Sequence, residues 1–176
     1  MHYEGRRKIR CRSYNKIKKI RIKFNDNAGS LYQKMILVGL PLLVEAIKEI
    51  MKKNYKMTFQ KENLSTYAKK IKKSETRIKW EENAKEINLK IRAFNPFPGA
   101  WTKIRGDDKR IKILKSEVVK KIVSQKNLVI GGVSDNLEVK CGNGSLKILE
   151  LQLEGKKALK NKEFLNGYKI KNLIFE

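Results

Sequence analysis

Histidine and cysteine are scarce in this sequence of 176 residues. The one histidine is His2, and the two cysteines, Cys11 and Cys141, stand far apart in the chain. Zinc sites need closely spaced Cys or His ligands, and disulfide frameworks need several cysteines. The sequence therefore predicts no metal site and no disulfide framework, and its cysteine usage is typical of a reduced, cytoplasmic protein.

Long apolar runs are also missing. The longest, MILVGLPLLVEAI at 35–47, contains Gly39 and Pro41 and is shorter than the ~18 residues that a membrane-spanning helix needs. The first residues, MHYEGRRKIRCRS, lack the apolar region of a secretory signal. We expect no association with a membrane.

Residues that could form a catalytic constellation are few. No serine or cysteine has a plausible base beside it in sequence, and Glu150 and Glu154 have no partner that would mark an acid/base pair. The glycines at 131–132 and 142–144 lie in expected hairpin turns, not before a helix where they could cradle phosphate. The sequence predicts no catalytic residue and is typical of a binding protein.

Acidic residues are outnumbered by basic ones. The chain has 42 Lys plus Arg against 18 Asp plus Glu, a net charge of +24. Such a charge attracts polyanions, above all nucleic acid, because counterions are released from phosphates. Most of the excess is lysine, and asparagine and isoleucine are also abundant, so codon usage in an A/T-rich genome is an alternative origin. The charge alone does not decide between the two.

The first half of the sequence predicts a strand, a helical segment and a linker. Residues 16–24 alternate apolar and basic side chains, the period of a half-buried strand. Residues 31–51 show helical apolar spacing, and Gly39-Leu40-Pro41 predicts two helices or one kinked helix. Residues 52–77 are rich in lysine without a clean period, which indicates an extended basic linker.

A rigid corner, AFNPFPGAW, occupies residues 93–101. Pro96 and Pro98 end the helix predicted for residues 81–94, and Gly99 gives the backbone freedom to turn. Apolar mass that would pin this corner onto a core comes from Phe94, Phe97 and Trp101.

The remaining sequence predicts short antiparallel strands. Five alternating segments are separated by turn sequences such as GDD, GG, SDN and GNG, a spacing typical of an OB-like, partly open barrel. The basic stretch at 155–170 predicts a closing helix that ends near Gly167. The fold class is α+β. The five predicted strands lie within residues 100–105, 110–119, 127–133, 136–142 and 145–154.

These blocks resemble the methionyl-tRNA formyltransferase family. RIKW at 77–80 and AFNPFPGAW are similar to the signature that opens the family's C-terminal domain. The likeness covers about residues 25–175. It continues through NAGSLYQKM (27–35), STYAKKI (65–71), RIKILK (110–115), CGNGSLKILELQLEGKKAL (141–159) and EFLNGYKI (163–170).

The resemblance implies a domain organisation. Residues 1–53 correspond to a remnant of the end of an α/β formyltransferase domain, with 1–24 expected to be disordered. Residues 54–79 form the basic linker, and residues 80–176 form an OB-like tRNA-binding domain. The family's motif residues, expected to be structural here, are Asn95, Pro96, Pro98, Gly99, Trp101, Gln152 and Gly155.

The sequence departs from the family at the catalytic motifs. No residue matches the family's catalytic Asn and His, and in the best alignment Gly5 matches but Arg7 takes the position of the Asp. Lys79 replaces an acidic residue of the family's signature. We therefore expect an N-terminally truncated member that binds tRNA without catalysis, without the family's donor 10-formyltetrahydrofolate as a cofactor of this chain.

The implied partner is initiator methionyl-tRNA, with a separately encoded catalytic half as a further partner, and the chain is expected to be a monomer. Two alternatives stay open: a stand-alone RNA-binding module, and a relative of the nucleotide-sugar (amino-sugar) formyltransferases. Each basic residue chosen as a tRNA contact is also open to interpretation as a solvated surface cation. The chosen residues are Lys69, Lys70, Lys72, Lys73, Arg92, Lys103, Arg105, Lys109 and Arg110.

Overall fold

The computed structural model describes residues 13–64, 66–119, 128–168 and 172–176. The chain divides into two compact units. The described part of the N-terminal unit comprises residues 13–24, 30–64 and 66–70. The C-terminal unit comprises residues 25–29 and, from residue 71, the rest of the described chain. It therefore takes in residues 71–79, which the sequence analysis assigned to the linker.

The N-terminal unit is built around one long helix, α1 (Ala28–Met51), and a short 3-10 helix, η2 (Glu62–Leu64). Pro41 lies inside α1, so the helical segment is one helix rather than two. No residue of α1 is buried. None of the described helices is long and apolar enough to cross a membrane.

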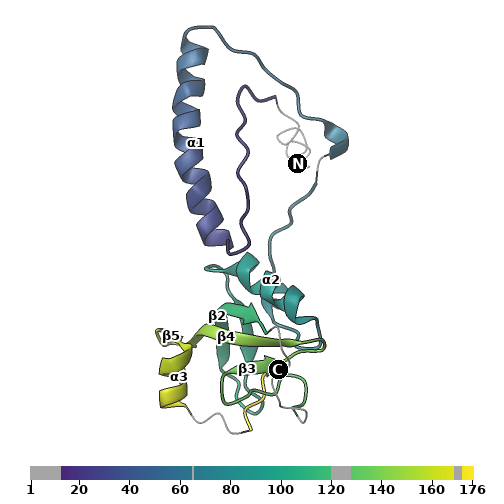
Figure 1. The fold of residues 1–176 in the computed structure, drawn as a ribbon. Coiled ribbons are helices and arrows are strands. Elements are labelled where there is room, and N and C mark those ends of the chain that lie inside the picture. Colours follow the sequence, from purple (N-terminus) through teal and green to yellow (C-terminus); the bar gives the residue numbers. More distant parts are fainter. Residues whose placement is uncertain (1–12, 65, 120–127, 169–171) are drawn as a thin grey trace, which may run out of the picture. The chain divides into compact units, whose positions relative to one another are not determined.

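The strand predicted for residues 16–24 is absent. These residues run as an extended segment beside α1 (Figure 1), where Lys16 pairs with Glu45 and Glu49. Among the described residues the segment has no neighbouring strand with which to form a ladder, and the one bridge nearby joins Tyr14 to Thr58. The prediction was wrong because alternation alone does not supply a pairing partner. Disorder was expected for residues 1–24, of which residues 1–12 lie outside the described part of the chain.

From residue 71 on, the first elements of the C-terminal unit are η3 (Lys73–Thr76) and α2 (Ala84–Phe94). The Asn83 side chain caps α2 by accepting a hydrogen bond from the Lys85 N–H at 2.9 Å. The helix therefore starts three residues after the predicted position. Its inner face buries Ala84, Ile87 and Ile91 at helical spacing.

A five-stranded antiparallel sheet follows in the order β1-β2-β4-β3, with β5 also paired to β4. Figure 1 shows this curled sheet with α2 on one side and α3 at the end of β5. The remaining elements are β1 (Ala100–Lys103), β2 (Arg110–Val118), β3 (Glu138–Lys140), β4 (Ser145–Leu153), β5 (Ala158–Lys160) and α3 (Asn161–Gly167).

One of the five predicted strands and part of the closing helix were wrong. Described residues 128–133 form a turn with isolated bridges rather than a strand, since Gly131 has a φ of +79° and bends the chain. The fifth strand is instead β5, within the segment predicted to be helical. The helix α3 is correspondingly short, because residues 158–160 gain hydrogen bonds by pairing with β4.

The core lies between α2, the inner face of the sheet and the C-terminal segment. Trp80 is 2% exposed, stacks on Phe175 at 5.8 Å between ring centroids and donates its indole N–H to Thr102 Oγ1 at 2.9 Å. The core residues are Ile78, Trp80, Ala84, Ile87, Ile91, Ala100, Ile111, Ile113, Val133, Leu137, Val139, Cys141, Leu146, Ile148, Leu151, Phe164 and Phe175.

Gly142, in the turn between β3 and β4, packs closely against the backbone of Trp80 and Glu81. Its N–H donates to the Trp80 carbonyl at 2.8 Å, and a Cβ at this position would lie 1.8 Å from the Glu81 carbonyl oxygen. Only glycine permits so close a backbone approach.

Candidate nucleic-acid interface

The outer face of β1 and β2 carries basic and aromatic side chains. Strand alternation buries Thr102, Ile111 and Ile113, so their neighbours face outward. The antiparallel register pairs Trp101 with Lys112 and Lys103 with Arg110. Two adjacent strands thus bring three cations and an indole ring together.

Trp101 is the centre of this face. The Arg110 guanidinium carbon lies 4.5 Å from the ring centroid, and that of Arg77 lies 5.6 Å from it. Both distances are within the range of a cation–π interaction. The indole N–H donates to the Lys73 carbonyl oxygen at 3.2 Å, which ties η3 to β1.

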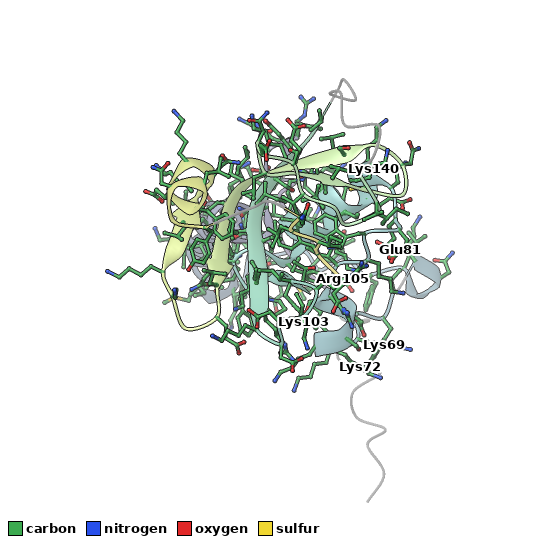
Figure 2. The ribbon with its side chains drawn as sticks, turned by 90° about the horizontal axis from the view of Figure 1, so that it is seen from below. Lys69, Lys72, Glu81, Lys103, Arg105 and Lys140 are labelled. Carbon is green, nitrogen blue, oxygen red and sulfur yellow. The ribbon has the colours of Figure 1, made fainter. Side chains whose placement is uncertain are left out.

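Two of the predicted contact residues are paired with acids. Lys103 Nζ lies 2.7 Å from Asp108 Oδ1, and this hydrogen bond and charge hold the Asp108 pKa below its usual value. Arg105 Nε lies 3.8 Å from Glu176 Oε2. In Figure 2 Lys103 and Arg105 lie on the same side of the view as Lys72, whereas Lys140, on the opposite edge strand β3, lies away from them.

The other predicted contact residues are placed differently. Lys69 and Lys70 are exposed in the N-terminal unit, and Lys72 and Lys73 are exposed at the start of the C-terminal unit. Lys109 is exposed, and its backbone N–H donates to Asp107 Oδ1 at 2.9 Å.

Arg92 is half-buried, and its Nη1 donates to the Asp26 carbonyl at 3.2 Å. This bond ties the last turn of α2 to the segment that precedes α1. Arg92 thus has a structural use within the C-terminal unit.

The proline corner lies directly before β1. The Asn95 side chain donates to the Leu114 carbonyl oxygen, and both X-Pro bonds, Asn95-Pro96 and Phe97-Pro98, are cis. Phe97 is 84% exposed, so the expectation that it pins the corner was wrong. Phe94 packs on the core instead, because it lies on the inner side of α2.

Gly99 completes the corner with a φ of +90°. A Cβ there would lie 3.0 Å from Lys112 Cδ, so the stem of that lysine crosses the glycine. At the other end of the sheet, Gln152 Nε2 donates to the Lys156 carbonyl at 2.9 Å, and Gly155 has a φ of +73° in the turn between β4 and β5.

No group of acids, cysteines or histidines that could hold a metal ion occurs among the described residues. Cys141 is fully buried, and burial raises its thiol pKa to about 12, so it is inert as a nucleophile at neutral pH. The absence of a metal site and of a catalytic residue stays a prediction.

Arg77 was missed by the sequence reasoning. It is exposed and forms a parallel bridge with Trp101, so the backbone places its side chain beside the indole. Its position within the RIKW motif is the one signal in the sequence that could have singled it out.

Residues 70–169 match the model for the formyl transferase C-terminal domain. The chain belongs to this family. The match begins three residues before η3 and includes α2, the proline corner, the five strands and α3.

Curated relatives include methionyl-tRNA formyltransferases. That of Mesorhizobium japonicum is 38% identical over 147 residues, which are 81% of this chain and 46% of the relative. That of Dictyoglomus turgidum is 39% identical over 160 residues, which are 88% of this chain and 50% of the relative. The chain spans about half the length of the curated relatives it matches.

Among solved structures, a variant of HypX from Aquifex aeolicus matches with a TM-score of 0.63 and 20% identity. The match covers 86% of this chain and 28% of HypX. At this level of identity the likeness shows a shared fold.

Proposed function

We propose that this chain binds initiator methionyl-tRNA through the outer face of β1 and β2 and the lysine-rich segment that precedes them. The observation that supports this proposal most directly is the concentration of exposed cations around Trp101, in a domain whose curated relatives are methionyl-tRNA formyltransferases. In this proposal the curled sheet acts as an OB-like binding barrel, and the protein works as a monomer in the cytoplasm.

The physical basis is counterion release. A long polyanion with evenly spaced charges binds more tightly to a surface on which many cations are spread, because each neutralised phosphate releases counterions. This chain has a net charge of +24. A nucleotide sugar has few charges and would leave most of these cations without a partner. The charge distribution thus favours RNA over the sugar-nucleotide alternative.

We further propose that the chain alone does not transfer a formyl group. A HypX structure has been determined in complex with tetrahydrofolic acid. For this chain's family, the sequence resemblance implies 10-formyltetrahydrofolate as the donor. The buried polar side chains among the described residues of the C-terminal unit each have a protein partner, which supports this part of the proposal. Thr76 donates to Lys73, Thr102 accepts from Trp80, Asn88 accepts from Ser116 and Ser134 accepts from Glu138.

The test is a salt titration with initiator tRNA. Changing Lys69, Lys70, Lys72 and Lys73 to Ala removes four cations and should flatten the slope of log K against log salt by roughly 3 to 4 units. The matched control changes four other exposed lysines, Lys85, Lys115, Lys157 and Lys162, to Ala.

A smaller loss in the control supports the proposal. Equal losses, or equal affinity for tRNA and a duplex DNA, would contradict it and favour codon usage as the origin of the charge. Formyl transfer by the purified chain would contradict the non-catalytic part.

A specific observation favours a protein partner in addition to RNA. Exposed large apolar side chains line α1, including Leu37 at 74% and Leu40 at 58%, and no residue of this helix is buried. Since the curated relatives are about twice as long as the matched region, we propose that a formyltransferase catalytic domain covers this surface.

Mixing experiments test the partner. The part of the Mesorhizobium relative outside the aligned region should co-elute with this chain in size-exclusion chromatography. Changing Leu40 and Val44, one turn apart on α1, to Asp should abolish co-elution, whereas changing the same two residues to Met, which keeps the surface apolar, should not. Equal effects of the two double variants would overturn the proposal.

A further inference from the structure

The Trp101 cluster consists of Arg77, Trp101, Arg110 and Lys112. Its cations come from three places in the sequence: the segment before α2, and the first and third residues of β2. The parallel bridge between Arg77 and Trp101 and the antiparallel pairing of Trp101 with Lys112 bring them together. The ring of Trp101 is half-buried, with two guanidinium groups at its surface.

The cations of the cluster differ from the neighbouring cations, because none of them forms an ion pair with an acidic side chain of the described chain. Lys103 and Arg105 are paired with Asp108 and Glu176, whereas no carboxylate of the described chain forms an ion pair with Arg77, Arg110 or Lys112. Glu154, the acid that comes near, accepts from the Arg110 backbone N–H at 3.0 Å and not from its guanidinium. Two guanidinium groups are thus held at one ring, and neither forms an ion pair with a carboxylate of the described chain.

Such an arrangement is unfavourable by itself and becomes favourable when an anion binds. Guanidinium groups match the oxygens of phosphate with paired N–H donors. Arg110 is stacked on the indole, and the Lys112 stem is held across Gly99, so both side chains have lost part of their freedom before any ligand arrives. Less entropy is then lost on binding.

We propose that the Trp101 cluster is a binding site for the phosphodiester backbone of RNA, in which Arg77 and Arg110 contact phosphate and Trp101 is a positioning residue that orients both guanidinium groups. This inference rests on the proposed RNA-binding function. It adds a defined contact site to it, and it assigns Trp101 a use beyond packing and Arg77 a use that the sequence motif alone did not indicate.

The first experiment compares two double variants at equal charge. Arg77→Ala with Arg110→Ala removes the guanidinium groups, and Lys157→Ala with Lys162→Ala removes two exposed cations from the region of β5 and α3. We expect the arginine variant to reduce the slope of log K against log salt for initiator tRNA by roughly 1.5 to 2 units, which corresponds to the loss of two phosphate contacts. The lysine variant should reduce this slope by less than half as much.

The second experiment keeps every charge and changes the ring. Trp101→Leu should weaken RNA binding about three- to tenfold and lower the salt slope by about 1 unit, because the guanidinium groups lose their cation–π support. Trp101→Phe, which keeps an aromatic face, should restore most of the affinity and the slope. Thermal unfolding of each variant is measured alongside, and an affinity that follows stability rather than the aromatic face would overturn the positioning role.

A third arm separates phosphate contact from base stacking. The cluster variants are titrated with a fully paired RNA duplex and with oligo(U), and phosphate contact predicts similar losses on both. Losses confined to oligo(U) would overturn the inference in favour of stacking on Trp101.

The outcomes also separate this inference from the function on which it rests. If the unaltered chain does not bind RNA with a salt-dependent affinity, both fail. If it binds and loses slope when the four linker lysines are removed, but the arginine and lysine double variants behave alike, the Trp101 cluster alone is refuted.

Discussion

The two units of the chain have similar stretches of apolar sequence but opposite burial. In the described part of the chain, every buried apolar residue lies in the C-terminal unit, although α1 in the N-terminal unit is the longest helix and rich in Leu, Ile, Val and Met. The helix α2 buries one face against a sheet, whereas α1 runs beside the extended segment at 13–24 and buries none of its residues. Apolar periodicity becomes a core only where a second layer covers it.

The largest expected effect is a matched pair of isoleucine substitutions in the two helices. Ile87 on α2 is 0% exposed and Ile47 on α1 is 48% exposed. Ile87→Ala should lower the free energy of unfolding of the C-terminal unit by about 2–5 kcal/mol, since it removes buried methyl groups and leaves a cavity. Ile47→Ala should change stability by less than about 0.5 kcal/mol.

Urea unfolding followed by circular dichroism measures both, and tryptophan fluorescence follows the C-terminal unit alone, because Trp80 and Trp101 both lie there. Similar losses for the two variants would mean that α1 is buried in solution and would break the comparison.

A second pair compares polar interactions. Thr102→Val removes the hydroxyl that accepts from the Trp80 indole and donates to the Glu176 carbonyl at 2.9 Å. The buried indole N–H is then left without an acceptor, so unfolding of the C-terminal unit should become easier by about 1–3 kcal/mol.

The counterpart in the N-terminal unit is Glu49→Gln, which removes the carboxylate that lies 2.6 Å from Lys16 Nζ and helps to raise the Lys16 pKa. This pair is solvated, so no measurable change in the urea midpoint is expected. A loss from Glu49→Gln as large as that from Thr102→Val would show that the N-terminal unit depends on this ion pair.

The smallest expected effect is a loss of stability at alkaline pH that comes from ionisation of Cys141. Burial raises its pKa from 9.0 to about 12, so the folded state keeps the thiol protonated while the unfolded state ionises. Its stabilising contribution is therefore complete below pH 9 and is lost as the pH rises toward 12. Between about pH 8 and about pH 10 the unaltered protein should lose about 1 kcal/mol more stability than Cys141→Ala.

Urea titrations of both proteins across this pH range provide the measurement, with lysine and tyrosine titration common to the two. Parallel pH profiles would show that the Cys141 thiolate is solvated in the folded state.

Much of the C-terminal unit was predictable because its local signals agree with its tertiary contacts. The period of α2, its proline end, and the alternation of β1, β2 and β4 all point to the face that is buried. The predictions failed where the conformation of a segment depends on the segment with which it pairs. The run at 128–133 looks like a strand but bends at Gly131. Strand β5 has one large apolar residue, Leu159, and owes its strand conformation to pairing with β4.

The sequence by itself determined the charge, the proline corner, the apolar faces of the C-terminal unit and the family, because each is written in composition or in short contiguous motifs. Only the tertiary structure decided which cations act together. Arg77, Trp101 and Arg110 are distant in sequence, and they meet because a parallel bridge and an antiparallel register place them side by side. Backbone pairing across strands sets such contacts, and no local pattern of residue types encodes it.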